Sequence, residues 1–139
     1  TFDGIIYCTQ VTANLLLRQF KIKPEHVRAL PLDKPVKLDI APNIITKNNI
    51  PVVSNNNNST STTSSSSKRK LQVVVTLIDA NHCPGSCIML FQIGNKMPYR
   101  YLLHTGDFRY IRSMRSHKAL KDISHLECLY LDTTYCNPK

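Results

Sequence analysis

Several residue types are scarce in this sequence of 139 residues, and each scarcity narrows the possible folds and functions. There is no tryptophan and aromatic residues make up only 7%, so a platform for stacking unpaired bases is not indicated. No apolar run approaches the roughly 20 residues of a membrane-spanning helix, so we expect no membrane partner. The length is typical of a single globular domain.

Acidic residues are also scarce, because 9 Asp and Glu stand against 18 Lys and Arg, which gives a formal net charge of +9. Lys and Arg release the counterions that condense on nucleic acid, so this excess favours a polyanionic partner such as DNA. A solvated basic surface is the other interpretation that charge alone allows.

The five cysteines are an odd number, and no secretory signal accompanies them. This argues against a disulfide framework and favours a reducing, intracellular compartment. Cys83 and Cys87 are close enough in the sequence to suit zinc, but no second Cys or His pair follows at zinc-finger spacing. Small buried thiols are therefore the favoured interpretation of these two residues.

The apolar pattern predicts a mixture of helices and strands. A helix is expected over 10–20, with Thr9 as its N-cap, and a short helix over 113–120. Strands or short extended pieces are expected at 4–8, 27–32, 36–40, 71–78, 87–93, 99–103 and 126–131. The run 71–78 is apolar on nearly both faces, which is typical of a central strand covered by two layers.

The segment 54–67 reads SNNNNSTSTTSSSS and contains no core-forming residue. Such a segment buries too little apolar surface to offset the entropy of ordering it, so we expect a disordered insertion at about 43–70. The sequence begins without Met and stops just after a strand-like run, so both ends are expected to be cuts within a longer protein.

Polar residues of the kinds that bind metals follow three of the expected strands. His82 follows 71–78, Asp107 follows 99–103, and Asp132 follows 126–131. If these strands share one sheet, the three side chains converge, and zinc accepts His nitrogen together with carboxylate oxygen. A carboxylate can also bridge two metal ions. Taken alone, a strand-end Asp is usually a turn former or a cap, and a lone His is usually a polar residue with satisfied hydrogen bonds, so the metal site rests on their convergence.

Three motifs carry a resemblance to a known family. The run 79–86 (DANHCPGS) strongly resembles a signature of the DNA-repair branch of the metallo-β-lactamase/β-CASP family, which contains the interstrand-crosslink-repair exonucleases and Artemis. The runs 104–109 (HTGDFR) and 131–139 (LDTTYCNPK) are similar to its next two landmarks, and 6–9 and 30–32 also resemble family sequence. The resemblance covers nearly the whole chain except about 42–70.

The resemblance implies an α+β fold, the metallo-β-lactamase αββα sandwich, with one or two zinc ions at one edge of the sheets. His82 matches a metal-ligand histidine, and Asp107 matches the aspartate that bridges the metals. Asp132 matches a further acidic position, so Asp107 and Asp132 are the expected catalytic residues. Asp79 is expected to be structural and to orient its loop. His104, three residues before Asp107, could support the ligands from behind, but this role is not the favoured one.

The three remaining histidines, His26, His117 and His125, have no comparable setting and are expected at the surface. The family's His-x-His-x-Asp-His motif and its β-CASP region have no match within residues 1–139. The chain is thus expected to be a partial metallo-β-lactamase-like domain, inactive by itself.

The parent protein is expected to be a zinc-dependent DNA nuclease, a 5′-to-3′ exonuclease, in the nucleus. Its expected roles are the repair of interstrand crosslinks and double-strand breaks. The alternatives are an RNA-cleaving or small-molecule hydrolase of the same fold, and a non-catalytic basic module that binds nucleic acid.

Overall fold

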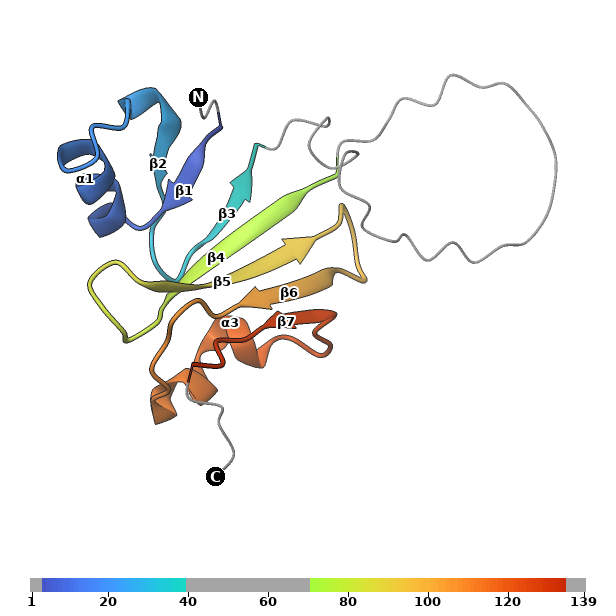
Figure 1. Cartoon of the computed structure of the whole chain (residues 1–139). Coiled ribbons are helices and arrows are strands. Elements are labelled where there is room, and N and C mark those ends of the chain that lie inside the picture. Colours follow the sequence, from blue (N-terminus) through green and yellow to red (C-terminus); the bar gives the residue numbers. More distant parts are fainter. Residues whose placement is uncertain (1–3, 40–70, 135–139) are drawn as a thin grey trace, which may run out of the picture.

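The computed structural model describes residues 4–39 and 71–134, and this part of the chain has an α+β fold with two sheets (Figure 1). The smaller sheet has two strands and the larger has five. The insertion predicted at 43–70 and the end of the third motif, 135–139, lie outside the described residues. Among the helices of the described ranges, none is long and apolar enough to cross a membrane.

The N-terminal unit is a helix packed on a pair of parallel strands. Its elements are β1 (Ile6–Cys8), α1 (Gln10–Arg18), the 3-10 helix η1 (Pro24–His26) and β2 (Val27–Ala29). Thr9 caps α1 as predicted, because its backbone is extended and its hydroxyl oxygen accepts a hydrogen bond from the Thr12 N–H at 3.4 Å. Ala13, which is 2% exposed, packs the helix against Cys8 and Val27.

The larger sheet has the strand order β3-β4-β5-β6-β7. Its strands are β3 (Pro35–Leu38), β4 (Val73–Asp79), β5 (Cys87–Ile93), β6 (Arg100–His104) and β7 (Cys128–Tyr130). Neighbouring strands are antiparallel except β6 and β7, which are parallel. Consequently β4, β6 and β7 run in the same direction, and their C-terminal ends meet at one edge of the sheet. The predicted sharing of one sheet is confirmed.

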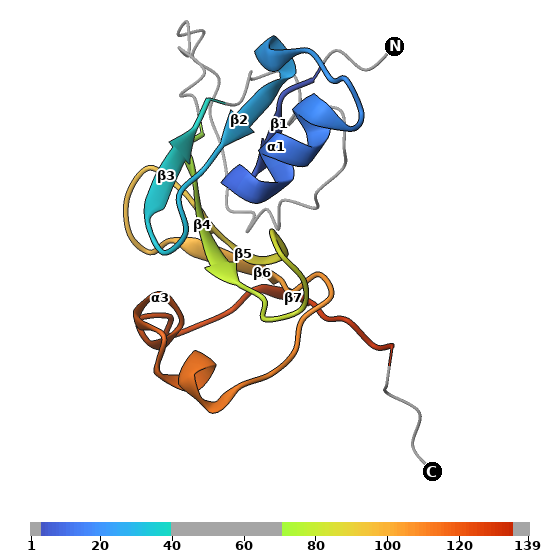
Figure 2. The same ribbon diagram turned by 90° about the vertical axis from the view of Figure 1, so that its left-hand side faces the viewer.

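Side chains alternate between the two faces of the sheet, and each face has its own core. Val75 and Leu77 of β4 are each 2% exposed and belong to a cluster with Leu30 and Leu38 on the face toward the N-terminal unit. On the opposite face, Ile78 belongs to a second cluster, which holds the segment after β6 against the sheet. Figure 2 shows the N-terminal unit and α3 on opposite sides of the sheet.

The segment after β6 differs from the single helix predicted at 113–120. It forms a 3-10 helix, η2 (Arg112–Ser116), and then the short α3 (Lys118–Lys121). His117 interrupts them with an extended backbone, φ −62° and ψ 124°. Met114 of η2 is buried against Ile78 and Ile88, and Phe108, Ala119 and Leu120 pack on the same cluster, so apolar contacts hold the segment against the sheet.

Two histidines that were expected at the surface are instead partly buried and paired. The side chain of His117 is 23% exposed, and its Nε2 lies 2.9 Å from Oδ1 of Asp33. The side chain of His26 is 24% exposed, with Nδ1 3.1 Å from the carbonyl oxygen of Gly4. The surface prediction was wrong for both, because their partners are far away in the sequence. His125 is exposed as predicted.

Candidate metal centre

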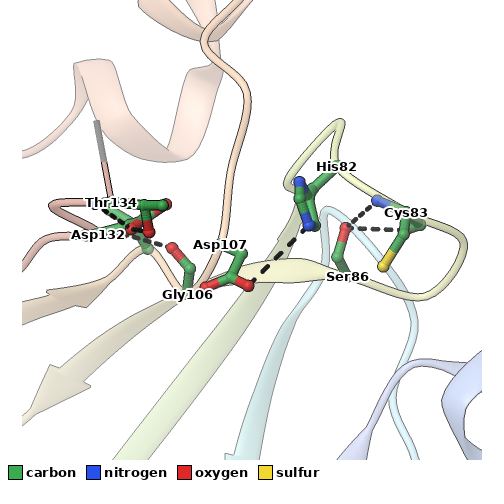
Figure 3. Close-up of polar contacts among 8 residues, drawn as sticks. His82, Cys83, Ser86, Gly106, Asp107, Asp132 and Thr134 are labelled. Carbon is green, nitrogen blue, oxygen red and sulfur yellow. Dashed lines mark hydrogen bonds and ion pairs between the residues drawn. The ribbon is translucent and has the colours of Figure 1, made fainter.

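The candidate metal centre lies where β4, β6 and β7 end. His82 follows β4, Asp107 follows β6 and Asp132 follows β7. Nε2 of His82 lies 3.9 Å from Oδ2 of Asp107, and the Asp107 carboxylate points toward the imidazole ring (Figure 3). Asp107 and Asp132 both line a hollow of about 410 Å³. The structure therefore brings together all three residues that the sequence singled out.

The loop that carries His82 is shaped by hydrogen bonds from its own residues. Oδ1 of Asp79 accepts a hydrogen bond from the Asn81 N–H at 2.6 Å, the loop-orienting geometry expected for Asp79. Asn81 has a φ of 51°, a left-handed conformation that asparagine tolerates better than most residues. On the other side of His82, Ser86 N–H donates to the Cys83 carbonyl at 3.0 Å and closes the turn.

Helix α1 holds the far end of the same loop. The hydroxyls of Thr9 and Thr12 lie 2.9 and 3.2 Å from the Gly85 carbonyl oxygen, to which they can donate. Gly85 has a φ of +90°, and a Cβ there would lie 2.7 Å from Oγ1 of Thr12. Glycine is thus required both by the backbone conformation and by the close approach of the helix. Reasoning from the sequence missed this contact between α1 and the loop that carries His82.

A pair of hydrogen bonds joins the His82 loop to the segment after Asp107. The Arg109 N–H donates to the Ala80 carbonyl at 2.9 Å, and the Asn81 side-chain amide donates to the Arg109 carbonyl at 3.3 Å. These bonds flank the two candidate ligands in the sequence, so they restrict the distance between them. Asn81 is a positioning residue that the sequence analysis did not identify. Its only signal was an asparagine in a turn directly before the histidine.

The turn that carries Asp107 is tied to β7. Gly106 has a φ of +54°, and its N–H donates to Nδ1 of His104 at 3.1 Å. The Thr105 hydroxyl donates to the Gly106 carbonyl at 2.8 Å and accepts from the Asp132 N–H at 3.0 Å. The His104 ring stacks on Tyr130 with centroids 5.5 Å apart. His104 therefore braces the turn, and Thr105 links the ends of β6 and β7.

Asp132 is held in its charged form. Its Oδ1 accepts hydrogen bonds from the Thr134 hydroxyl at 2.6 Å and the Thr134 N–H at 2.9 Å. These bonds keep the pKa of Asp132 below its ordinary value, and the nearby His82 lowers it further. A carboxylate in this state accepts hydrogen bonds or binds cations at neutral pH and does not donate a proton.

The donors present fit zinc in kind, since zinc takes imidazole nitrogen and carboxylate oxygen together. Catalytic zinc sites usually have three protein ligands. Within 4–39 and 71–134, no group of three or more His, Cys, Asp or Glu side chains is arranged to hold an ion. Burial raises the pKa of the Cys87 thiol, which disfavours the thiolate that binds metal. His82 and Asp107 thus offer donors of the right kind for zinc, but fewer than a catalytic zinc site usually has.

Comparison with known proteins identifies relatives of the chain. No protein-family model matches it. It is 33% identical over 139 residues to the DNA cross-link repair 1A protein of Mus musculus and 30% over 136 residues to the DNA cross-link repair protein pso2/snm1 of Schizosaccharomyces pombe. It is 35% identical over 138 residues to the 5′ exonuclease Apollo of Rattus norvegicus. These matches cover 99%, 98% and 99% of the chain but only 10%, 18% and 20% of the relatives.

Over nearly its whole length, the chain is therefore similar to a short segment of relatives that are named for DNA cross-link repair or as a 5′ exonuclease. The resemblance predicted from its motifs, to the DNA-repair branch of the metallo-β-lactamase/β-CASP family, is confirmed by these similarities.

Proposed function

We propose that the full-length protein is a zinc-dependent DNA nuclease that removes nucleotides in the 5′-to-3′ direction. Residues 1–139 would form part of its metallo-β-lactamase αββα domain. The observation that carries this proposal is the approach of His82 and Asp107 to 3.9 Å at a sheet edge that Asp132 shares. A relative that is similar over 99% of this chain is a 5′ exonuclease, which supports the direction of cleavage.

Nε2 of His82 and Oδ2 of Asp107 are the atoms that would hold the ion in this segment. When bound, zinc supplies Lewis acidity toward a phosphodiester oxygen and makes water a nucleophile near neutral pH. Asp107 would contribute negative charge beside a bound ion, and Asp132 stays ionised because the hydrogen bonds from Thr134 lower its pKa. The bonds through Asn81 and Thr105 keep these groups from moving as the charge on phosphate changes.

DNA is the proposed partner. The full-length protein would act in the nucleus, where it would take part in the repair of interstrand crosslinks and double-strand breaks. The net charge of +9 supports a polyanionic substrate, and contacts with phosphate would make binding sensitive to salt and largely insensitive to sequence. Two of the relatives carry DNA cross-link repair in their names, which supports this pathway.

The test is cleavage by the full-length protein of matched DNA and RNA single strands, each labelled at one end. We expect DNA to be cut with release of nucleotides from the 5′ end, and cleavage to stop when a chelator is added. Faster cleavage of RNA would favour the RNA-cleaving alternative. Binding without cleavage of either polymer would favour the non-catalytic module.

A further inference from the structure

All the acidic or basic residues in the segment directly after Asp107, apart from one histidine, are Arg or Lys. Residues 108–121 (FRYIRSMRSHKALK) contain no Asp or Glu. Basic residues occur at every third position, namely Arg109, Arg112, Arg115, Lys118 and Lys121. A spacing of three matches the three residues per turn of a 3-10 helix, so in such a helix these side chains project on one side.

Part of this segment is a 3-10 helix, and it forms a hollow. Arg112 and Arg115 are the first and fourth residues of η2, and with Tyr110 and Ser116 they line a hollow of about 490 Å³. Two arginines and two residues with hydroxyl groups therefore line this open hollow, and no acidic residue lines it. Guanidinium groups and hydroxyls together are suited to binding phosphate oxygens.

Both guanidinium groups are available to a ligand. Within 4–39 and 71–134, neither Arg112 nor Arg115 makes a side-chain hydrogen bond or an ion pair. Arg100, in contrast, has its Nε and Nη2 bound to the carboxylate of Glu127. An arginine already paired with a carboxylate has to lose that partner before it can bind phosphate. The two arginines of η2 have no such competitor in this part of the chain.

The hollow is held at a fixed place relative to the candidate metal centre. Met114, between the two arginines, is 8% exposed and packs on the sheet, so it anchors η2 while the arginines face outward. The bond from Arg109 N–H to the Ala80 carbonyl attaches the start of the segment to the His82 loop. Four residues lie between Asp107 and Arg112, so the Cα atoms of these two residues are at most about 18 Å apart. A DNA strand rises about 3.4 Å per nucleotide, so the hollow is within about five nucleotides of the metal centre.

We propose that Arg112 and Arg115, with the hydroxyls of Tyr110 and Ser116, form a second phosphate-binding site. It holds one backbone phosphate of the DNA strand a few nucleotides from the bond that is cut. This inference rests on the proposed function and adds to it a defined position for the substrate strand. The site binds the strand and takes no part in the chemical step.

Binding is measured with the full-length protein and a fluorescently labelled single strand, with the metal chelated so that no cleavage occurs. We expect the double variant Arg112→Gln/Arg115→Gln to bind about tenfold more weakly at low salt, the scale of one charge-assisted contact. The slope of log K against log salt should become shallower by about one, because one phosphate contact fewer is made. The matched control, Lys37→Gln/Lys96→Gln, removes the same charge from the opposite end of the sheet.

Restoring charge without the arginine geometry separates a phosphate site from a general basic surface. The variant Arg112→Lys/Arg115→Lys should recover the salt slope but only part of the affinity, because lysine does not form the two-pronged contact. Equal melting temperatures show that the variants fold. The proposed site is overturned if the Gln double variant has the same DNA affinity and the same salt slope as the Lys37→Gln/Lys96→Gln control variant. It is also overturned if the wild-type protein does not bind DNA. Wild-type cleavage is scored separately, so a protein that binds DNA through this site but cuts nothing contradicts only the proposed function.

Discussion

Nε2 of His82 lies 3.9 Å from Oδ2 of Asp107, although the two residues follow different strands. Strand β5 lies between β4 and β6 and is antiparallel to both. Strands β4 and β6 therefore run in the same direction and end at the same edge of the sheet. The approach of the two side chains is a consequence of this topology, and the hydrogen bonds at Asn81 and Arg109 hold the loops in place.

The first prediction concerns zinc and residues 1–139 alone. We expect this chain to hold zinc weakly, because His82 and Asp107 are two ligands where zinc sites usually have three or four. Equilibrium dialysis with metal analysis measures this, and full-length protein serves as the control that binds tightly. Tight, stoichiometric zinc on residues 1–139 would contradict the expectation and would make Cys83 and Cys87 candidate ligands.

The contact between α1 and the loop that carries His82 predicts how Gly85→Ala changes the stability of the protein. The new Cβ would meet Oγ1 of Thr12 at 2.7 Å, whereas a Cβ at Gly94 has no neighbour closer than 3.5 Å. Both glycines have positive φ, so Gly94→Ala controls for backbone strain. We expect Gly85→Ala to lower the free energy of unfolding by roughly 1–2 kcal/mol more than Gly94→Ala. If urea unfolding shows the same loss of unfolding free energy for Gly85→Ala and Gly94→Ala, helix α1 does not constrain the loop.

The pair Arg100–Glu127 joins β6 to the residue before β7 and predicts a dependence on pH. The hydrogen bonds from Arg100 lower the pKa of Glu127 from its ordinary 4.5. The stability from this pair is therefore complete above pH 4.5 and is lost as the pH falls through the lower, folded pKa. Since 38% of the Glu127 side chain is exposed, we expect Glu127→Gln to cost at most about 1 kcal/mol at neutral pH.

The control for this pair is the variant Glu25→Gln. The Glu25 side chain of the wild type is 68% exposed, and its carboxylate lies 3.8 Å from Nζ of Lys23. Its removal should leave the unfolding free energy nearly unchanged. Thermal melts at pH 3 to 7 should show the wild type and Glu127→Gln converging at the acid end. A difference between them that stays constant over this range would disprove the assigned ion pair.

The cysteines should differ in their reactivity toward a thiol reagent. Burial raises the pKa of both Cys8 and Cys87, so these thiols remain protonated at neutral pH and should react slowly. Cys83 is exposed, so the buried thiol expected from the sequence was wrong for this residue, and it should be labelled before Cys8 and Cys87. Timed labelling of the native protein, followed by mass spectrometry of its peptides, measures the order. Labelling of Cys87 as fast as that of Cys83 would contradict the burial of this strand.

The sequence predicted the strands well because apolar runs bounded by turn formers have few alternatives. The strand at Cys87–Ile93 and the cap at Thr9 agree with the structure. The helix predicted at 113–120 was less accurate, because tertiary contacts of Met114 and His117 favour a 3-10 helix followed by a break. Local periodicity does not report such contacts.

The candidate site was predicted from residue types at strand ends, and its geometry follows from strand direction. The supporting contacts were not predictable in this way. The hydrogen bonds of Gly85 with Thr9 and of Asp132 with Thr105 join residues that are far apart in the sequence. They depend on which loops meet after folding, and a single sequence carries no pattern for that.

The central claim is that Asp107 binds metal for cleavage, and Asp107→Asn in the full-length protein tests it most directly. Asparagine has nearly the same size but no charge, and it substitutes well in a turn. We expect the fold and DNA binding to be kept, and the cleavage rate at saturating zinc to fall at least about a hundredfold. Asp122→Asn, an exposed aspartate at the end of α3, is the matched control and should cleave normally. A wild-type cleavage rate for Asp107→Asn, with an unchanged melting temperature, would contradict the metal centre and leave Asp107 a turn residue.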